Sequence, residues 1–139
     1  MFMLDASRKT QMNRKNILVV DDSPTMRRMV IASLRDLQEV SFDEASNGLE
    51  AIEHLALTSV GLVVLDLNMP DMHGLEVVKF VRQHQAYRAI PIIVLTTRGD
   101  ETSRLAVMAA GASVYLTKPF LPSALAASAR ELLQGKSSG

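Results

Sequence analysis

The chain has 139 residues, lacks cysteine, and balances 15 lysines and arginines against 15 aspartates and glutamates. That length suits a single domain, and the missing cysteines exclude disulfides and thiolate metal sites. Zero net charge gives no general reason to bind nucleic acid, and no stretch resembles a secretory signal or a membrane span, so we expect a cytoplasmic protein with no membrane insertion.

The N-terminal residues show no sustained hydrophobic period. We therefore predict a disordered tail over residues 1–15, because such a segment has no apolar face to bury. The single domain is predicted over 16–134, with a short C-terminal tail over 135–139.

The first half of the domain alternates strand-like and helical patterns. Residues 17–20 form an uncharged apolar run, which is typical of a buried parallel strand. Ser23-Pro24 offers a helix cap and a proline at the first helical position, and apolar residues recur at helical spacing over 24–37. We then predict a half-exposed edge strand over 40–45 and a helix that contains Leu49, Ile52 and Leu55.

The second half repeats this alternation. Residues 62–65 and 92–95 are again uncharged apolar runs, so we predict two more buried strands. The helix between them, over 75–83, turns inward either Leu75, Val78 and Val81 or Val77, Phe80 and Val81. A helix over 101–110 stopped by Gly111, an edge strand over 113–117 and a helix over 121–133 complete the pattern.

Five strands that alternate with five helices predict an α/β fold, a doubly wound, flavodoxin-like five-stranded parallel sheet. Only the second and fifth strands alternate polar and apolar residues, which favours the order 2-1-3-4-5 because only its end strands are edges. The order reverses between the first and third strands. Open α/β sheets bind ligands at the carboxyl ends of the strands at such a reversal.

Polar residues follow the buried strands at that end of the predicted sheet. Asp21 and Asp22 end the first run, Asp66 the second, and Thr96 the third. Carboxylates on neighbouring strands would approach within about 5 to 6 Å and repel by roughly 3 kcal/mol per pair. The cluster should therefore hold a proton or a cation. Oxygen ligands without cysteine or converging histidine favour Mg²⁺, with Mn²⁺ as a substitute.

Lys118 and Pro119 follow the last strand. Lys118 would lie roughly 10 Å from the end of the third strand, so only a long cationic side chain could reach Asp66. An X-Pro bond after a strand tolerates a cis peptide, and the sequence leaves the isomer of Lys118-Pro119 open. A nucleophilic Asp66, Mg²⁺, Lys118 and the Thr96 hydroxyl together describe phosphoryl transfer onto aspartate.

These residues resemble the receiver domains of two-component response regulators over about residues 16–133. The resemblance is specific because five of the family's elements occur in order at fitting strand ends. They are the acidic pair, the phosphoacceptor, the switch hydroxyl, the switch aromatic and the Lys-Pro step, here Asp21-Asp22, Asp66, Thr96, Tyr115 and Lys118-Pro119. The run from Asp22 to Arg28 is most similar to single-domain chemotaxis-type receivers.

The resemblance implies a Mg²⁺-dependent switch. A histidine kinase or phosphotransfer domain would donate a phosphoryl group to Asp66, with the ion held by Asp22, Asp66 and the main-chain carbonyl of Asn68, and with Asp21 acting mainly through ion-bound water. The protein would catalyse its own phosphorylation and dephosphorylation without being a classical enzyme. We hypothesise that Arg98 contacts the site entrance and alters the lifetime of the phosphoryl group.

The resemblance also implies an output surface. Phosphorylation would pull the Thr96 loop inward and let Tyr115 turn from solvent toward the core. A downstream target would then bind the fourth helix, fifth strand and fifth helix, here about 101–110, 113–117 and 121–133. We expect a chemotaxis or motility output, while dimerisation is left open.

Three alternatives are open from the sequence. The chain could be a receiver-like interaction module that is never phosphorylated, or a receiver domain excised from a hybrid kinase or larger regulator. A Mg²⁺-dependent aspartyl phosphatase is disfavoured because Asn68 stands where a second acid is expected. Taken singly, Asp21 and Asp22 could be helix caps and Tyr115 simple edge packing, but their joint placement favours a site.

Overall fold

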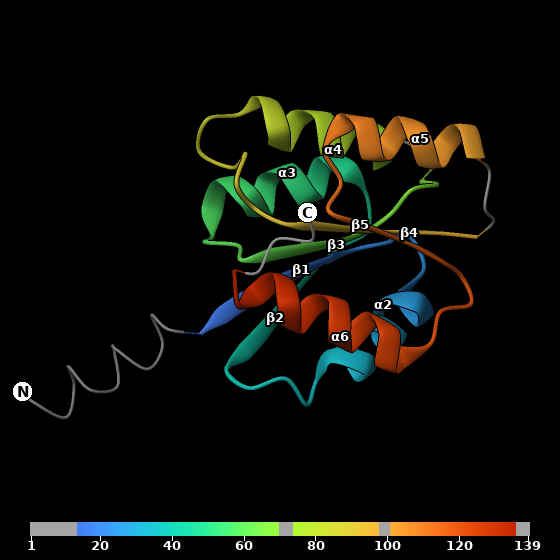
Figure 1. Ribbon diagram of the computed structural model, residues 1–139. Helices are drawn as coiled ribbons and strands as arrows, with labels where there is room; N and C mark the ends of the chain where they lie inside the picture. The colour runs from blue at the N-terminus through green and yellow to red at the C-terminus, as the bar shows by residue number, and fades with distance from the viewer. Residues whose placement is uncertain (1–13, 70–73, 98–100, 136–139) are drawn as a thin grey trace, which may run out of the picture.

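A parallel sheet lies between two layers of helices in the computed structural model, which describes residues 14–69, 74–97 and 101–135 (Figure 1). The strands are β1 (Lys15–Val20), β2 (Val40–Ala45), β3 (Leu62–Asp66), β4 (Ile92–Thr96) and β5 (Val114–Thr117). All pair in parallel, in the order β2-β1-β3-β4-β5. The predicted order and the doubly wound, flavodoxin-like fold are confirmed.

The helices divide between the two faces of the sheet. They are α2 (Pro24–Leu34), α3 (Gly48–Leu57), α4 (Gly74–Gln83), α5 (Glu101–Ala110) and α6 (Pro122–Leu133). Helices α3, α4 and α5 cover one face, and α2 and α6 cover the other (Figure 1). Both faces of the central strands are therefore buried, as their unbroken apolar sequences require.

The start of α2 agrees with its sequence, but its end does not. Ser23 Oγ accepts from the Met26 N–H at 3.2 Å, and Pro24 is the first helical residue. The helix ends at Leu34 and not at residue 37, so our prediction was three residues too long. The Leu37 N–H donates to the Leu34 carbonyl, three residues back, and Glu39 then adopts a φ of +58°, which turns the chain into β2.

The core consists of two apolar clusters, one on each face of the sheet. Every residue of β3 and β4 is buried, whereas the edge strands β2 and β5 are mostly half-buried. Helix α4 buries Val77, Val78 and Val81, which is neither of the two predicted faces in full. Within the described ranges, no helix combines the length and apolar character that crossing a membrane requires.

Candidate functional site

Three carboxylates gather at the carboxyl end of the sheet, where the strand order reverses. Asp21 and Asp22 directly follow β1, and Asp66 is the last residue of β3. Val20 pairs with Leu65 in the sheet, which brings the residues after them side by side. One oxygen of each carboxylate lies within 4.8 Å of the other two, slightly closer than strand spacing predicts.

One lysine bridges the two buried members of this cluster. Asp21 and Asp66 are 3% and 5% exposed, whereas Asp22 is exposed. Lys118 Nζ lies 3.1 Å from Asp66 Oδ1 and 3.2 Å from Asp21 Oδ2. The long side chain therefore spans the distance from β5 to β3 that the sequence led us to expect. Among the described residues, one cation faces two buried carboxylates.

The pKa of Asp66 reflects its burial beside a second acid. Burial raises the pKa of the Asp66 carboxyl above its ordinary value, and the neighbouring Asp21 charge raises it further. The Lys118 ammonium and a hydrogen bond from the Asn68 N–H act in the opposite direction but do not cancel the rise. An additional cation at this end of the sheet would therefore favour the ionised form of Asp66.

The backbone and side chain of Asp21 are fixed at four points. Its N–H donates to the Ala45 carbonyl at 3.0 Å. Its Oδ1 accepts from the Ser23 N–H at 2.9 Å, and its Oδ2 accepts from Lys118. Its carbonyl accepts from Arg27 Nη1 at 2.6 Å, a contact that the sequence did not suggest. Helix capping is supplied by the Ser23 hydroxyl, so it does not explain why Asp22 is present.

Thr96 and Asn68 lie beside the cluster. Thr96 ends β4 and is 3% exposed, and its Oγ1 accepts from Asn68 Nδ2 at 3.4 Å. The Thr96 carbonyl accepts from the Lys118 N–H at 2.6 Å, which ties the start of the Lys118 segment to the end of β4. The Lys118–Pro119 peptide bond is cis.

Tyr115 differs from our expectation that its ring faces solvent before phosphorylation. It pairs with Val94 across the β4–β5 ladder and packs against the apolar cluster under α3, α4 and α5. Its hydroxyl is buried and has no hydrogen-bond partner among the described residues. The ring already lies inward because edge strand β5 is half-buried at this position.

Gly74 allows the start of α4 to lie against the end of β3. A Cβ atom there would come within 2.7 Å of Leu67 Cα and 2.8 Å of the Asp66 carbonyl oxygen, both backbone atoms. The Gly74 N–H donates to the Leu67 carbonyl at 2.9 Å. The glycine therefore fixes how closely α4 approaches Asp66. Arg98, which we expected at the site entrance, lies outside the described residues.

The donor set fits a hard divalent cation. The three carboxylates offer only oxygen, and their ligand atoms are close enough to share one ion. Two of them are buried on either side of Lys118, and burial together with the neighbouring Asp21 raises the pKa of Asp66. Zinc and copper sites are built mainly from imidazole and thiolate ligands, which this cluster lacks.

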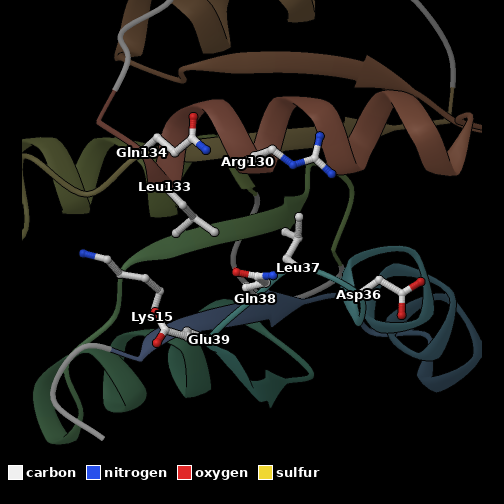
Figure 2. A pocket seen from close by; sticks show the side chains of 8 residues that line it. All are labelled: Lys15, Asp36, Leu37, Gln38, Glu39, Arg130, Leu133 and Gln134. Carbon is white, nitrogen blue, oxygen red and sulfur yellow. The ribbon is translucent and has the colours of Figure 1, made fainter. Parts of the chain in front are cut away.

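A separate hollow lies at the opposite end of the sheet and contains none of these residues. It has a volume of about 510 Å³ and is lined by residues at the start of β1, after α2 and at the end of α6 (Figure 2), namely Lys15, Asp36, Leu37, Gln38, Glu39, Arg130, Leu133 and Gln134. Its charged side chains are of both signs and are exposed. This hollow and the buried charges are thus at different ends of the sheet.

Comparisons with known proteins agree with this geometry. A family model described as "Response regulator receiver domain" matches residues 17–130. Chemotaxis protein CheY1 of Helicobacter pylori is 42% identical over 110 residues, which cover 78% of this chain and 89% of that protein. The chemotaxis protein CheY homolog of Campylobacter jejuni is 40% identical over 124 residues, covering 88% and 95%. A high-resolution structure of chemotaxis response regulator CheY4 of Vibrio cholerae is similar with a TM-score of 0.77 and 34% identity, covering 86% of this chain and 98% of that one.

Proposed function

Because the chain belongs to the family of response regulator receiver domains, we propose that it is a switch whose state is set by phosphorylation of Asp66. The observation that carries this proposal is the placement of Asp66. It is buried at a strand end, its Oδ1 lies 3.1 Å from Lys118 Nζ, and a second buried acid shares that lysine. Burying two carboxylates with one cation disfavours folding, and carboxylates placed in this way are candidates for a chemical role.

We propose that the same end of the sheet binds Mg²⁺, for which Mn²⁺ can substitute. Asp22, Asp66 and the main-chain carbonyl of Asn68 would hold the ion, and Asp21 would act mainly through ion-bound water. When bound, the ion supplies positive charge to the phosphoryl oxygens and to the carboxylates. The oxygen-only donor set and the raised pKa of Asp66 support this assignment.

The transfer itself is a displacement at phosphorus. A carboxylate oxygen of Asp66 forms a bond to phosphorus, the phosphorus–nitrogen bond of a phosphohistidine donor breaks, and the imidazole nitrogen keeps the electron pair and takes a proton from solvent. Lys118 stays beside Asp66 as a fixed positive charge for the phosphoryl oxygens. The donor is a histidine kinase or phosphotransfer domain, and the protein supports its own phosphorylation and dephosphorylation.

The response to phosphorylation involves Thr96 and Tyr115. New phosphoryl oxygens accept from the Thr96 hydroxyl and from Lys118, drawing the end of β4 inward. Tyr115 packs inward beside β4, and its buried hydroxyl has no hydrogen-bond partner among the described residues, so we expect movement at the end of β4 to change the contacts of this ring. Reversing a two-state population from 1:99 to 99:1 requires about 5.5 kcal/mol, within reach of a few charge-assisted hydrogen bonds.

The output surface is formed by α5, β5 and α6, and a downstream target protein binds it. Two large apolar side chains on α5, Leu105 and Met108, are 59% and 39% exposed and lie three residues apart, on one side of the helix. Relatives named as chemotaxis proteins favour a chemotaxis or motility output in the cytoplasm. We predicted a receiver domain over 16–134 between tails at 1–15 and 135–139, but Lys15 is already the first residue of β1 and pairs with Val40, so in this proposal the domain begins one residue earlier.

Intact-mass measurement after incubation with acetyl phosphate tests the proposal. With Mg²⁺ we expect a gain of one phosphoryl group, which disappears when Mg²⁺ is withheld and in the Asp66→Ala variant. A small-molecule donor can fail where a kinase succeeds, so beryllium fluoride binding is measured in parallel. No mass gain and no Mg²⁺-dependent beryllium fluoride binding would favour an interaction module that is never phosphorylated.

A further inference from the structure

The loop that carries Asp21 and Asp22 is held by a side chain from outside the carboxylate cluster. Arg27, the fourth residue of α2, donates from Nη1 to the Asp21 carbonyl at 2.6 Å and from Nε to Glu44 Oε1 at 2.8 Å. Its side chain is only 15% exposed. One guanidinium thus connects the loop after β1 to the end of the edge strand β2 through two of its N–H groups.

This contact acts on the peptide group between the two acids. The Asp21 carbonyl belongs to the rigid plane that also contains the Asp22 nitrogen. A hydrogen bond that fixes the direction of this carbonyl therefore fixes the orientation of the Asp21–Asp22 peptide. The orientation of this peptide in turn sets the position from which the Asp22 side chain projects.

The two acids depend on this contact to different degrees. The Asp21 carboxylate is also held by the Ser23 N–H and by Lys118. In the part of the chain that the structure describes, the Asp22 carboxylate is exposed and makes no hydrogen bond. Its direction is therefore set by its backbone, which Arg27 restrains.

We propose that Arg27, braced by Glu44, is a positioning residue that orients Asp22 for cation binding. This inference rests on the proposed function, in which Asp22 is a ligand of the divalent ion. Positioning and charge predict opposite effects of removing Arg27. A guanidinium near the carboxylates repels a divalent cation, so charge alone predicts tighter binding without it, whereas loss of positioning predicts weaker binding.

Direct Mn²⁺ binding distinguishes the two effects without any phosphorylation assay. Free Mn²⁺ is measured by electron paramagnetic resonance during titration of the wild type, Arg27→Ala, Arg27→Lys and Arg28→Ala. We expect the Arg27→Ala Kd to rise about 10- to 100-fold, as is typical when a group that supports a metal ligand is lost. Arg27→Lys keeps the charge but cannot donate in both directions, so it should not restore binding. Arg28→Ala removes the same charge from the neighbouring, exposed position and should change Kd by less than about twofold.

Thermal unfolding shows whether each variant is folded. A second pair of variants, at Glu44, tests the inference even if Arg27→Ala does not fold. Glu44→Ala removes the brace and should weaken Mn²⁺ binding several-fold, while Glu44→Gln keeps an oxygen acceptor for Arg27 and should stay closer to the wild type. Folded Arg27→Ala protein that binds Mn²⁺ as tightly as Arg28→Ala, or more tightly, would overturn the inference. Should Arg27→Ala fail to fold, unchanged binding in Glu44→Ala would overturn it. Wild-type protein that binds no Mn²⁺ would refute the cation site of the proposed function, and this inference with it.

Discussion

The two ends of the sheet carry similar side chains in opposite environments. At the carboxyl end, Asp21 and Asp66 are buried, and the Lys118 side chain, only 12% exposed, lies within hydrogen-bonding distance of both. At the amino end, Lys15 and Glu39 are exposed beside the hollow of Figure 2, and neither forms an ion pair with a described residue. Desolvating charge costs free energy and leaving it in water does not. Buried charge, and not the hollow, therefore distinguishes the end of the sheet that we propose as the functional site.

Removing one lysine from each end gives the largest expected contrast. Lys118→Met leaves two buried carboxylates without their cation and should lower the free energy of unfolding by about 3 kcal/mol at neutral pH without Mg²⁺. Lys15→Met removes an exposed charge and should change it by less than about 0.5 kcal/mol. Urea unfolding followed by circular dichroism measures both. Equal losses of unfolding free energy in the two variants would contradict the difference in buried charge between the two ends.

Adding one methyl group at each end of the sheet tests how tightly the backbone is packed there. At Gly74 the new Cβ would meet the backbone of Asp66 and Leu67 at under 3 Å, so Gly74→Ala should destabilise the protein by about 2 kcal/mol. At Gly61 the nearest atoms are 3.6 Å away, and Gly61→Ala should be neutral or slightly stabilising. The same unfolding experiment applies. A Gly74→Ala variant as stable as Gly61→Ala would mean that α4 can shift without disturbing the site.

Neutralising Asp66 should make the protein more stable. The pKa of Asp66 is raised above its ordinary 3.8, so the folded state disfavours the ionised form. That penalty is absent below pH 3.8, grows as the pH rises through the raised pKa, and is complete above it. Asp66→Asn should therefore exceed the wild type in unfolding free energy by about 1 kcal/mol at pH 7 without Mg²⁺. This advantage should shrink on acidification, and a pH-independent difference would contradict the assigned cause.

Relief of backbone strain at the amino end is the smallest expected effect. Glu39 adopts a φ of +58°, a conformation that glycine tolerates better than other residues. Glu39→Gly should raise the free energy of unfolding by about 0.5 kcal/mol. Glu39→Ala removes the same carboxylate but keeps the strain, so it should bring no gain. If both variants behave alike, the carboxylate and not the backbone controls stability at this position.

The fold could be predicted from the sequence almost entirely. The uncharged runs of β1, β3 and β4 and the half-polar edges β2 and β5 dictate burial, and burial dictates strand order. The end of α2 could not be predicted, because apolar spacing continues to Leu37 while the chain leaves the helix after Leu34. The buried face of α4 could not be chosen from the sequence either, because the adjacent Val77 and Val78 fit two overlapping helical patterns of apolar residues.

The gathering of candidate site residues could also be anticipated, because strand ends fix where Asp21, Asp22 and Asp66 lie. The role of Arg27 could not. Its partners are a main-chain carbonyl and Glu44, seventeen residues away, and neither contact leaves a periodic signal in the sequence. The inward ring of Tyr115 was missed because a half-buried edge strand permits either direction.

Locating the phosphoryl group within the chain tests the central claim most directly. After incubation with acetyl phosphate and Mg²⁺, sodium borohydride converts an aspartyl phosphate to homoserine, and tryptic peptides are then sequenced by mass spectrometry. Asp66 falls in the peptide of residues 36–79, whereas Asp21 and Asp22 fall in the peptide of residues 16–27. We predict homoserine at position 66 alone. Homoserine at position 21 or 22, with Asp66 unmodified, would contradict the account.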